Sequence, residues 1–101
     1  MSYLEAIKIG QISDGEMKTV SLNGKVVAVA QVGKEYFAFD DLCTHKQCSL
    51  AEGTLEGQEV VCPCHGGKFD VKTGQATALP AVSPVTTYPV KVENGFIYVE
   101  C

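Results

Sequence analysis

The residues of this chain best suited to chemistry are cysteines and histidines, and they lie close together in the sequence. Four of the five cysteines and both histidines fall between residues 43 and 65, in the segments Cys43-Thr44-His45 and Cys62-Pro63-Cys64-His65 with Cys48 between them. Thiolate and imidazole groups are the ligands that iron, zinc and iron–sulfur clusters take from proteins. The concentration therefore indicates an inorganic site rather than a packed core.

The spacing within each segment predicts which side chains can face one centre. Cys43 and His45 are two residues apart, so in an extended segment they point to the same side, roughly 7 Å apart along the backbone. Cys62 and His65 are three residues apart, which a turn can bring to one side. Because Cys64 is adjacent to His65 and tends to point away from it, Cys62 is the better candidate ligand.

Length and charge limit the classes of function. The chain has 101 residues, and its formal charge of −4 comes from 12 acidic residues and 8 lysines, with no arginine. We expect one domain, 1–101, and no nucleic-acid binding, because arginine forks and a basic patch are missing. The longest apolar run, Val26 to Ala30, is too short to cross a membrane, and no basic segment followed by an apolar stretch opens the chain. We therefore expect a cytoplasmic protein without membrane insertion.

The elements that must position these residues are predicted to be strands. Apolar and polar residues alternate over Met17 to Leu22, Val26 to Val32, Tyr36 to Phe39 and Phe96 to Val99. Asn23-Gly24 and Asn94-Gly95 are typical of tight hairpin turns, which need positive φ angles. No segment has the period of a helix, so an all-β sandwich or partly open barrel follows.

Two loops with the candidate ligands lie on either side of a predicted hairpin, Thr54 to Val61, which would bring their tips together. A third loop is expected over Leu79 to Pro84, because Pro80 and Pro84 do not fit a central strand.

The ligand pattern resembles that of a known family. Cys-x-His, sixteen intervening residues and Cys-x-x-His are similar to the motif of Rieske [2Fe–2S] proteins. The resemblance extends to Gly66-Gly67-Lys68-Phe69-Asp70, Thr73-Gly74, the Pro80/Pro84 loop and Asp14-Gly15-Glu16, and so covers nearly the whole chain. It implies three stacked antiparallel sheets with two cluster-binding loops and a proline loop at one end, the cluster-binding part being about 41–84.

The resemblance also implies a ligand set. Cys43 and Cys62 would hold one iron of a single [2Fe–2S] cluster, and His45 and His65 the other. Neutral imidazoles in place of two thiolates make the cluster less negative and raise its reduction potential. The histidine-bound iron would lie toward solvent, which makes His45 and His65 the expected exit edge for electrons.

The surroundings of the cluster are inferred in the same way. Gly66 and Gly67 would let backbone N–H groups approach the cluster sulfurs, and Pro80 belongs to the covering loop. Respiratory Rieske proteins carry hydroxyl donors at the places of Gly67 and Phe69, so their absence predicts a potential in the lower part of the range of roughly −150 to +300 mV.

The resemblance further assigns two extra thiols. Cys48 and Cys64 stand where respiratory Rieske proteins have a disulfide between the two loops, although many Rieske ferredoxins lack it. We expect this pair to be bridged. Cys101 has no partner in this scheme and is expected to be an exposed terminal thiol.

Several other interpretations remain open from the residues alone. A Cys₂His₂ zinc site would make the chain a zinc-stabilised binding module, although zinc ligands usually come as closely spaced cysteine doublets. A catalytic Cys-His dyad would leave most of the ligand-like residues unexplained. Four charged residues near the ligands could contact a partner protein or could be ordinary solvated or turn-forming residues: Lys46, Lys68, Asp40 and Asp41. Two apolar residues, Leu50 and Val82, could exclude water from the cluster or belong to the core.

The resemblance implies an electron carrier rather than an enzyme. Rieske oxygenases add a mononuclear iron held by further histidines, whereas both histidines here are already assigned. A Rieske ferredoxin of this kind takes electrons from a reductase and passes them to a terminal oxygenase, commonly one that hydroxylates aromatic rings. The runner-up is a Rieske-like small subunit of a nitrite reductase or of another oxidoreductase complex. The oligomeric state is not predicted.

Overall fold

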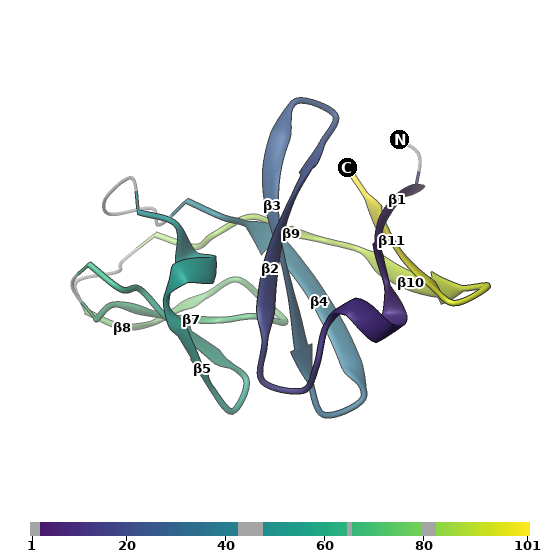
Figure 1. Cartoon of the computed structure of the whole chain (residues 1–101). Helices are drawn as coiled ribbons and strands as arrows, with labels where there is room; N and C mark the ends of the chain where they lie inside the picture. The colour runs from purple at the N-terminus through teal and green to yellow at the C-terminus, as the bar shows by residue number, and fades with distance from the viewer. Residues whose placement is uncertain (1–2, 43–47, 65, 80–82) are drawn as a thin grey trace.

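The computed structural model describes residues 3–42, 48–64, 66–79 and 83–101, and in this part of the chain eleven strands form three antiparallel sheets (Figure 1). The terminal sheet has the order β1 (Tyr3–Lys8), β11 (Phe96–Glu100), β10 (Val90–Glu93). The central sheet has the order β2 (Met17–Leu22), β3 (Lys25–Val32), β4 (Glu35–Asp40), β9 (Thr87–Tyr88). The loop sheet has the order β5 (Thr54–Glu56), β6 (Glu59–Val61), β7 (Lys68–Asp70), β8 (Ala76–Ala78). Two 3₁₀ turns, η1 (Ile9–Gln11) and η2 (Leu50–Glu52), complete the described elements.

The central sheet lies between the other two and is covered on both faces (Figure 1). In β3 the residues from Val27 to Ala30 are all fully buried. Ala28 and Ala30 pack in one core cluster with residues of the loop sheet, and Val27 and Val29 pack in a second cluster with residues of the terminal sheet. A strand covered on both faces is apolar at every position, which explains the unbroken run in this segment.

The predicted hairpins are confirmed. β2 and β3 pair with Leu22 opposite Lys25, and β10 and β11 pair with Glu93 opposite Phe96. Both Asn-Gly turns have positive φ at both residues, at Asn23, Gly24, Asn94 and Gly95. The all-β prediction is also confirmed, and the observed strands extend the predicted ones by a residue or less at each end.

One expectation about the end of the chain is wrong. Cys101 is only 5% exposed and packs in the core cluster between the central and terminal sheets. Side chains alternate between the two faces of β11, so Ile97 and Val99 point inward, and so does Cys101, one residue beyond the strand. β1 and β10 pair along the two edges of β11. The period of two, continued by one residue, would have predicted this burial.

Within the described residues, we find no helix with the length and apolar character needed to cross a membrane.

Gly74 gives a test of how the turn after β7 is built. Its φ is +81°, its N–H donates to the Asp70 carbonyl (2.7 Å), and its own carbonyl accepts from Val85 N–H (2.8 Å). A Cβ here would overlap the Val85 carbonyl oxygen. We expect Gly74→Ala to lower the free energy of unfolding by about 3 kcal/mol, from the left-handed backbone and the overlap together.

Gly57 is the matched control, because its φ is +61° but a Cβ there would meet open space. Gly57→Ala should cost only about 1 kcal/mol. Urea unfolding of both variants measures the difference, and equal losses would contradict this account.

Candidate metal centre

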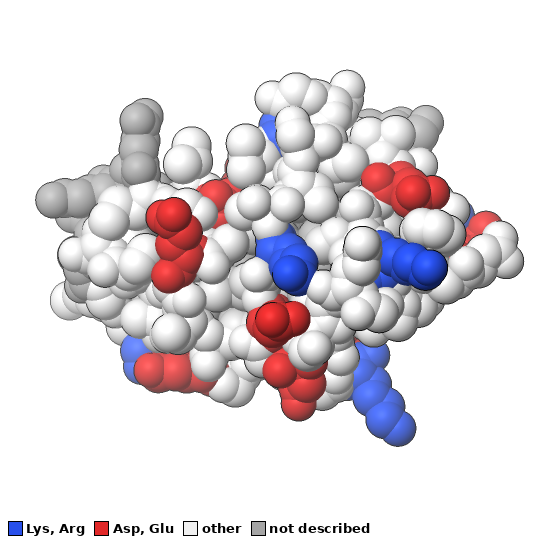
Figure 2. Space-filling model, viewed as in Figure 1, with Lys and Arg blue, Asp and Glu red and all other residues white. Residues whose placement is uncertain are grey.

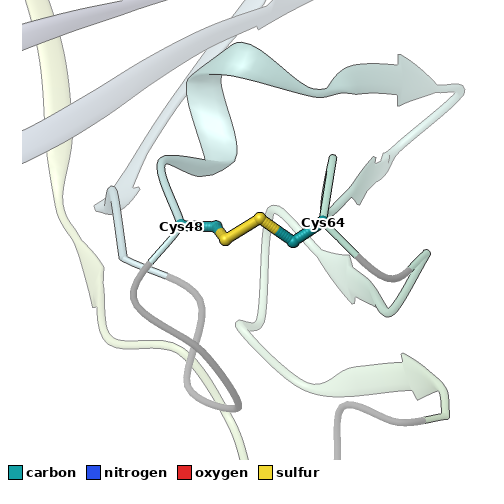
Figure 3. Close-up of a disulfide and its surroundings, with 2 residues drawn as sticks. All are labelled: Cys48 and Cys64. Carbon is teal, nitrogen blue, oxygen red and sulfur yellow. A yellow bond between two sulfur atoms is a disulfide. The ribbon is translucent and has the colours of Figure 1, made fainter.

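The two loops with the predicted ligands meet beside the hairpin that separates them. In that hairpin Thr54 pairs with Val61, so the chain enters β5 and leaves β6 at the same end. Cys48 in the first loop (residues 42–49) and Cys64 in the second loop (residues 62–67) form a disulfide with a Cα–Cα distance of 6.5 Å (Figure 3). The structure therefore contains the bridge that the family resemblance implied, and it holds the two loops side by side.

The second loop is a closed turn built on the core. Cys62 N–H donates to the Gly67 carbonyl (2.8 Å), and Gly66 N–H donates to the Cys62 carbonyl (3.0 Å). Cys62 is 1% exposed and belongs to the core cluster that also contains Phe69. Cys64 is exposed. The turn thus separates an inward cysteine from an outward one, and the outward one is joined to the first loop.

Gly66 helps to close this turn through its backbone. Its N–H bonds to the Cys62 carbonyl, and the approach of backbone N–H groups to the cluster sulfurs beside Gly66 and Gly67 stays a prediction. A Cβ at this position would meet no atom of the described structure within 4 Å, whereas φ is +75°. The left-handed backbone is by itself a reason for glycine at this position.

Phe69 is fully buried in β7, where it pairs with Val60. It offers no hydroxyl to its surroundings, which keeps the prediction of a lower potential in place. Leu50, whose role was open, is fully buried in the same core cluster as Phe69. The predicted ligands Cys43, His45 and His65, together with Pro80, Lys46 and Val82, lie outside the described residues.

The segment that follows the third loop is tied to β4, the strand that leads into the first loop. Asp40 N–H donates to the Thr86 carbonyl (2.9 Å), and the Tyr88 hydroxyl donates to the Asp40 carboxylate (2.5 Å). Burial and this carboxylate both raise the pKa of Tyr88 well above its usual value. The hydroxyl therefore stays protonated and keeps donating. Sequence reasoning missed this pair, since its members are 48 residues apart.

Two of the charged residues beside the loops, Lys68 and Asp41, have partners or burial that the structure describes. Lys68 makes an ion pair with Glu56 (3.0 Å), and this hydrogen-bonded carboxylate raises the pKa of the lysine. Asp41 is buried, which is incompatible with a direct contact to a partner protein. Both residues have roles within the chain.

The described residues fit an iron–sulfur cluster held between the two loops. Cys64 is consumed by the disulfide, and a disulfide sulfur is not the thiolate that binds iron. The other cysteine of the second loop, Cys62, is buried at its base, as a ligand to a shielded iron must be. The disulfide holds together the two loops that carry the predicted ligands.

Comparison with known proteins identifies the family. Residues 2–89 match the model of the Rieske [2Fe-2S] domain. The ferredoxin component of the naphthalene 1,2-dioxygenase system of Pseudomonas putida is 42% identical over 94 residues, which is 93% of this chain and 90% of that protein. The chain belongs to the Rieske [2Fe–2S] family, and the cofactor of the family is one Rieske-type cluster.

Solved structures agree with this assignment. A ferredoxin of Sphingomonas yanoikuyae B1 superimposes with a TM-score of 0.94 at 37% identity, covering 99% of each chain. A ferredoxin chain of the complex of reduced oxygenase and oxidized ferredoxin in carbazole 1,9a-dioxygenase superimposes with a TM-score of 0.92 at 37% identity, covering 96% of this chain and 91% of that one. The predicted stack of three sheets is confirmed. A small subunit of a putative nitrite reductase shares the fold with a TM-score of 0.83, but at 17% identity.

Removing the disulfide should lower the stability of the fold. Cys48 and Cys64 are 16 residues apart in sequence, and opening a closed loop of this size lowers the free energy of unfolding by about 3 kcal/mol. We expect the double variant Cys48→Ser/Cys64→Ser to show this loss in denaturant unfolding. Reductant should destabilise the parent protein and leave the variant unchanged.

Alkylation of the denatured, chelator-treated protein without reductant, followed by mass spectrometry, checks the bond directly. The disulfide predicts that Cys48 and Cys64 stay unmodified. Modification of both would show that the two thiols are reduced in the purified protein.

Proposed function

We propose that this chain is a one-electron carrier that takes electrons from a reductase and delivers them to a terminal oxygenase of the type that attacks aromatic rings. The observation that carries the proposal is similarity over nearly the full chain to ferredoxin components of dioxygenase systems. It acts as a component of an oxidoreductase system and not as an enzyme by itself. We place it in the cytoplasm, where soluble redox partners of this kind operate.

We further propose Cys43, His45, Cys62 and His65 as the cluster ligands. The motif spacing supports this set, as does the disulfide, which removes Cys48 and Cys64 from the candidates. When bound, the cluster supplies a redox centre that accepts and releases one electron. Cys62 would hold the shielded iron from its buried position in the core. The two imidazoles keep the ligand set less negative than four thiolates would be.

Replacing one imidazole tests the ligand set. We expect His65→Cys to keep a bound iron–sulfur cluster and to lower its midpoint potential toward the plant-type value of about −400 mV, because a thiolate adds negative charge at the cluster. Redox titration followed by electron paramagnetic resonance of the reduced state measures it. The parent protein should titrate in the lower part of the Rieske range.

An unchanged potential in His65→Cys would contradict the assignment of this residue. A colourless parent protein with no signal in the reduced state would contradict the cluster itself and leave the zinc-stabilised module. The nitrite reductase alternative receives no support beyond the shared fold, because the similarity at 17% identity concerns the fold alone.

The surface next to the loops indicates how an oxygenase would bind. Leu42, which precedes the first loop ligand, is 51% exposed, and Leu79, at the start of the third loop, is 78% exposed. The described residues within the three loops carry no charged side chain: Leu42, Cys48, Ser49, Cys62, Pro63, Cys64, Gly66, Gly67, Leu79, Ser83 and Pro84. Charged residues do lie next to them, namely the buried Asp41, Lys68 and the exposed Glu52. In Figure 2 the leftmost described atoms, where β8 lies in Figure 1, are correspondingly white.

Exposed leucines in an uncharged surface are typical of a contact with another protein. We propose that this surface docks on an apolar, uncharged patch of the terminal oxygenase. A contact made mainly by these apolar side chains should depend only weakly on ionic strength, with Lys46 of the first loop as the one charged group of the loop segments themselves.

Leu79→Asp tests the docking surface. The variant places an unpaired charge in an apolar contact, so we expect electron transfer to an oxygenase of a dioxygenase system to slow by about tenfold. Stopped-flow oxidation of the reduced protein, at low and high salt, measures the rate. The parent rate should change by less than about twofold with salt.

Val92→Asp is the matched control, because Val92 is 47% exposed on β10 in the terminal sheet, away from the loops. Its rate should equal that of the parent. A similar loss in both variants would contradict the proposed surface, and a steep salt dependence of the parent would contradict its apolar character.

A further inference from the structure

Asp41 is the only charged side chain that is buried in the described part of the molecule. It is 5% exposed and follows the last residue of β4, two positions before the predicted ligand Cys43. Burying a carboxylate costs free energy unless hydrogen bonds replace its water. A buried aspartate at this place therefore needs a structural reason.

The bonds of Asp41 join the two ends of the first loop. Ala51 N–H donates to the carboxylate oxygen Oδ1 (2.9 Å), and Leu50 N–H donates to the Asp41 carbonyl (2.6 Å). Leu42 and Ser49, the residues next to Asp41 and Leu50 on the loop side, form an isolated β-bridge. The residue before the loop is thus bonded to the first two residues of η2 that follow it, and the loop is closed at its base.

Both sides of this base are attached to the rest of the fold. Asp41 N–H donates to the Val26 carbonyl (3.2 Å), which holds it to the N-terminal end of β3. Leu50 is fully buried in the core cluster that contains Cys62. The base of the first loop therefore rests on the same packed residues as the base of the second.

We propose that Asp41 is a positioning residue for the first pair of ligands, Cys43 and His45. The inference rests on the proposed ligand set. In a buried place a hydrogen bond to the side-chain oxygen is not weakened by competition with water. It fixes the separation of the two ends of the first loop, which carries Cys43 and His45, while the disulfide of Cys48, next to Ser49 of the β-bridge, joins this loop to the second one.

Two substitutions separate the hydrogen bond from the negative charge. Asp41→Ala removes the acceptor for Ala51 N–H, whereas Asp41→Asn keeps an Oδ1 acceptor and removes only the charge. We expect the cluster of Asp41→Ala to be lost to a chelator about tenfold faster than that of the parent protein, with changed g values in the reduced state. Asp41→Asn should stay within about twofold of the parent and keep its g values.

Asp14 is the matched control for a merely structural role. Gly33 N–H donates to its carboxylate (2.7 Å), so a bond of the same chemical type, but exposed, joins the turn between β3 and β4 to the turn before β2, at the opposite end of β3 and β4. Asp14→Ala should lower the denaturant midpoint, while the chelator rate and the g values of its cluster stay those of the parent.

The proposal is overturned if Asp41→Ala keeps the parent chelator rate and g values, or if Asp41→Asn loses its cluster as fast as Asp41→Ala. If Asp41→Ala does not fold, Asp41→Asn decides alone, and altered g values in it would overturn the proposal. A parent protein without a Rieske signal would instead refute the proposed function, so the two failures are distinguishable.

Discussion

The structure depends on the burial of one strand from both sides. From Val27 to Ala30, β3 has no exposed residue, and its side chains alternate between two core clusters. A strand of this kind is stable only when another layer covers each face. The terminal sheet covers one face and the loop sheet the other, so the three-layer arrangement follows from this constraint.

The two faces of β3 differ in the size of their side chains. Ala28 and Ala30 face the loop sheet, and their small volume accommodates Phe39 and Phe69, which are both fully buried in the same cluster. Pairing small residues with large ones lets facing layers reach normal packing density. The loop sheet, though made of short strands, is therefore firmly attached to the centre of the molecule.

The candidate metal centre is an extension of that packed core. Leu50 at the base of the first loop and Cys62 at the base of the second both belong to the cluster shared by the central and loop sheets. The Cys48–Cys64 disulfide then joins the loops beyond their bases. Binding of a cluster by such loops stabilises the fold, because a ligand that binds only the native state adds its binding free energy.

The described residues within the loops are uncharged, whereas charged side chains lie beside the loops, at Glu52 in η2 and at Lys68 and Glu56 in the loop sheet. The chain carries a net charge of −4, yet its described loop residues expose Leu42 and Leu79. The nearest ion pair, Lys68 with Glu56, is satisfied within the chain. Such a surface suits the brief, small contacts of electron-transfer proteins.

Much of this protein could be predicted from the sequence by itself, because the signals are local. Alternation fixed the main strands, Asn-Gly pairs fixed two hairpin turns, and the spacing of Cys43, His45, Cys62 and His65 indicated the family. Each signal lies within a few neighbouring residues, or in a motif whose parts are recognised by spacing. The three-sheet order came from the family resemblance and not from the pattern.

Only the tertiary structure decided the contacts between distant residues. It pairs β1 with β11 and so buries Cys101, it joins Tyr88 to Asp40, and it places Asp41 against η2. Side chains such as Asp41 have no periodic or spacing signal, since their partners are chosen by packing after the sheets assemble. The sequence thus determined which groups can bind a cluster, and the packed core decided how the loops that carry them are held.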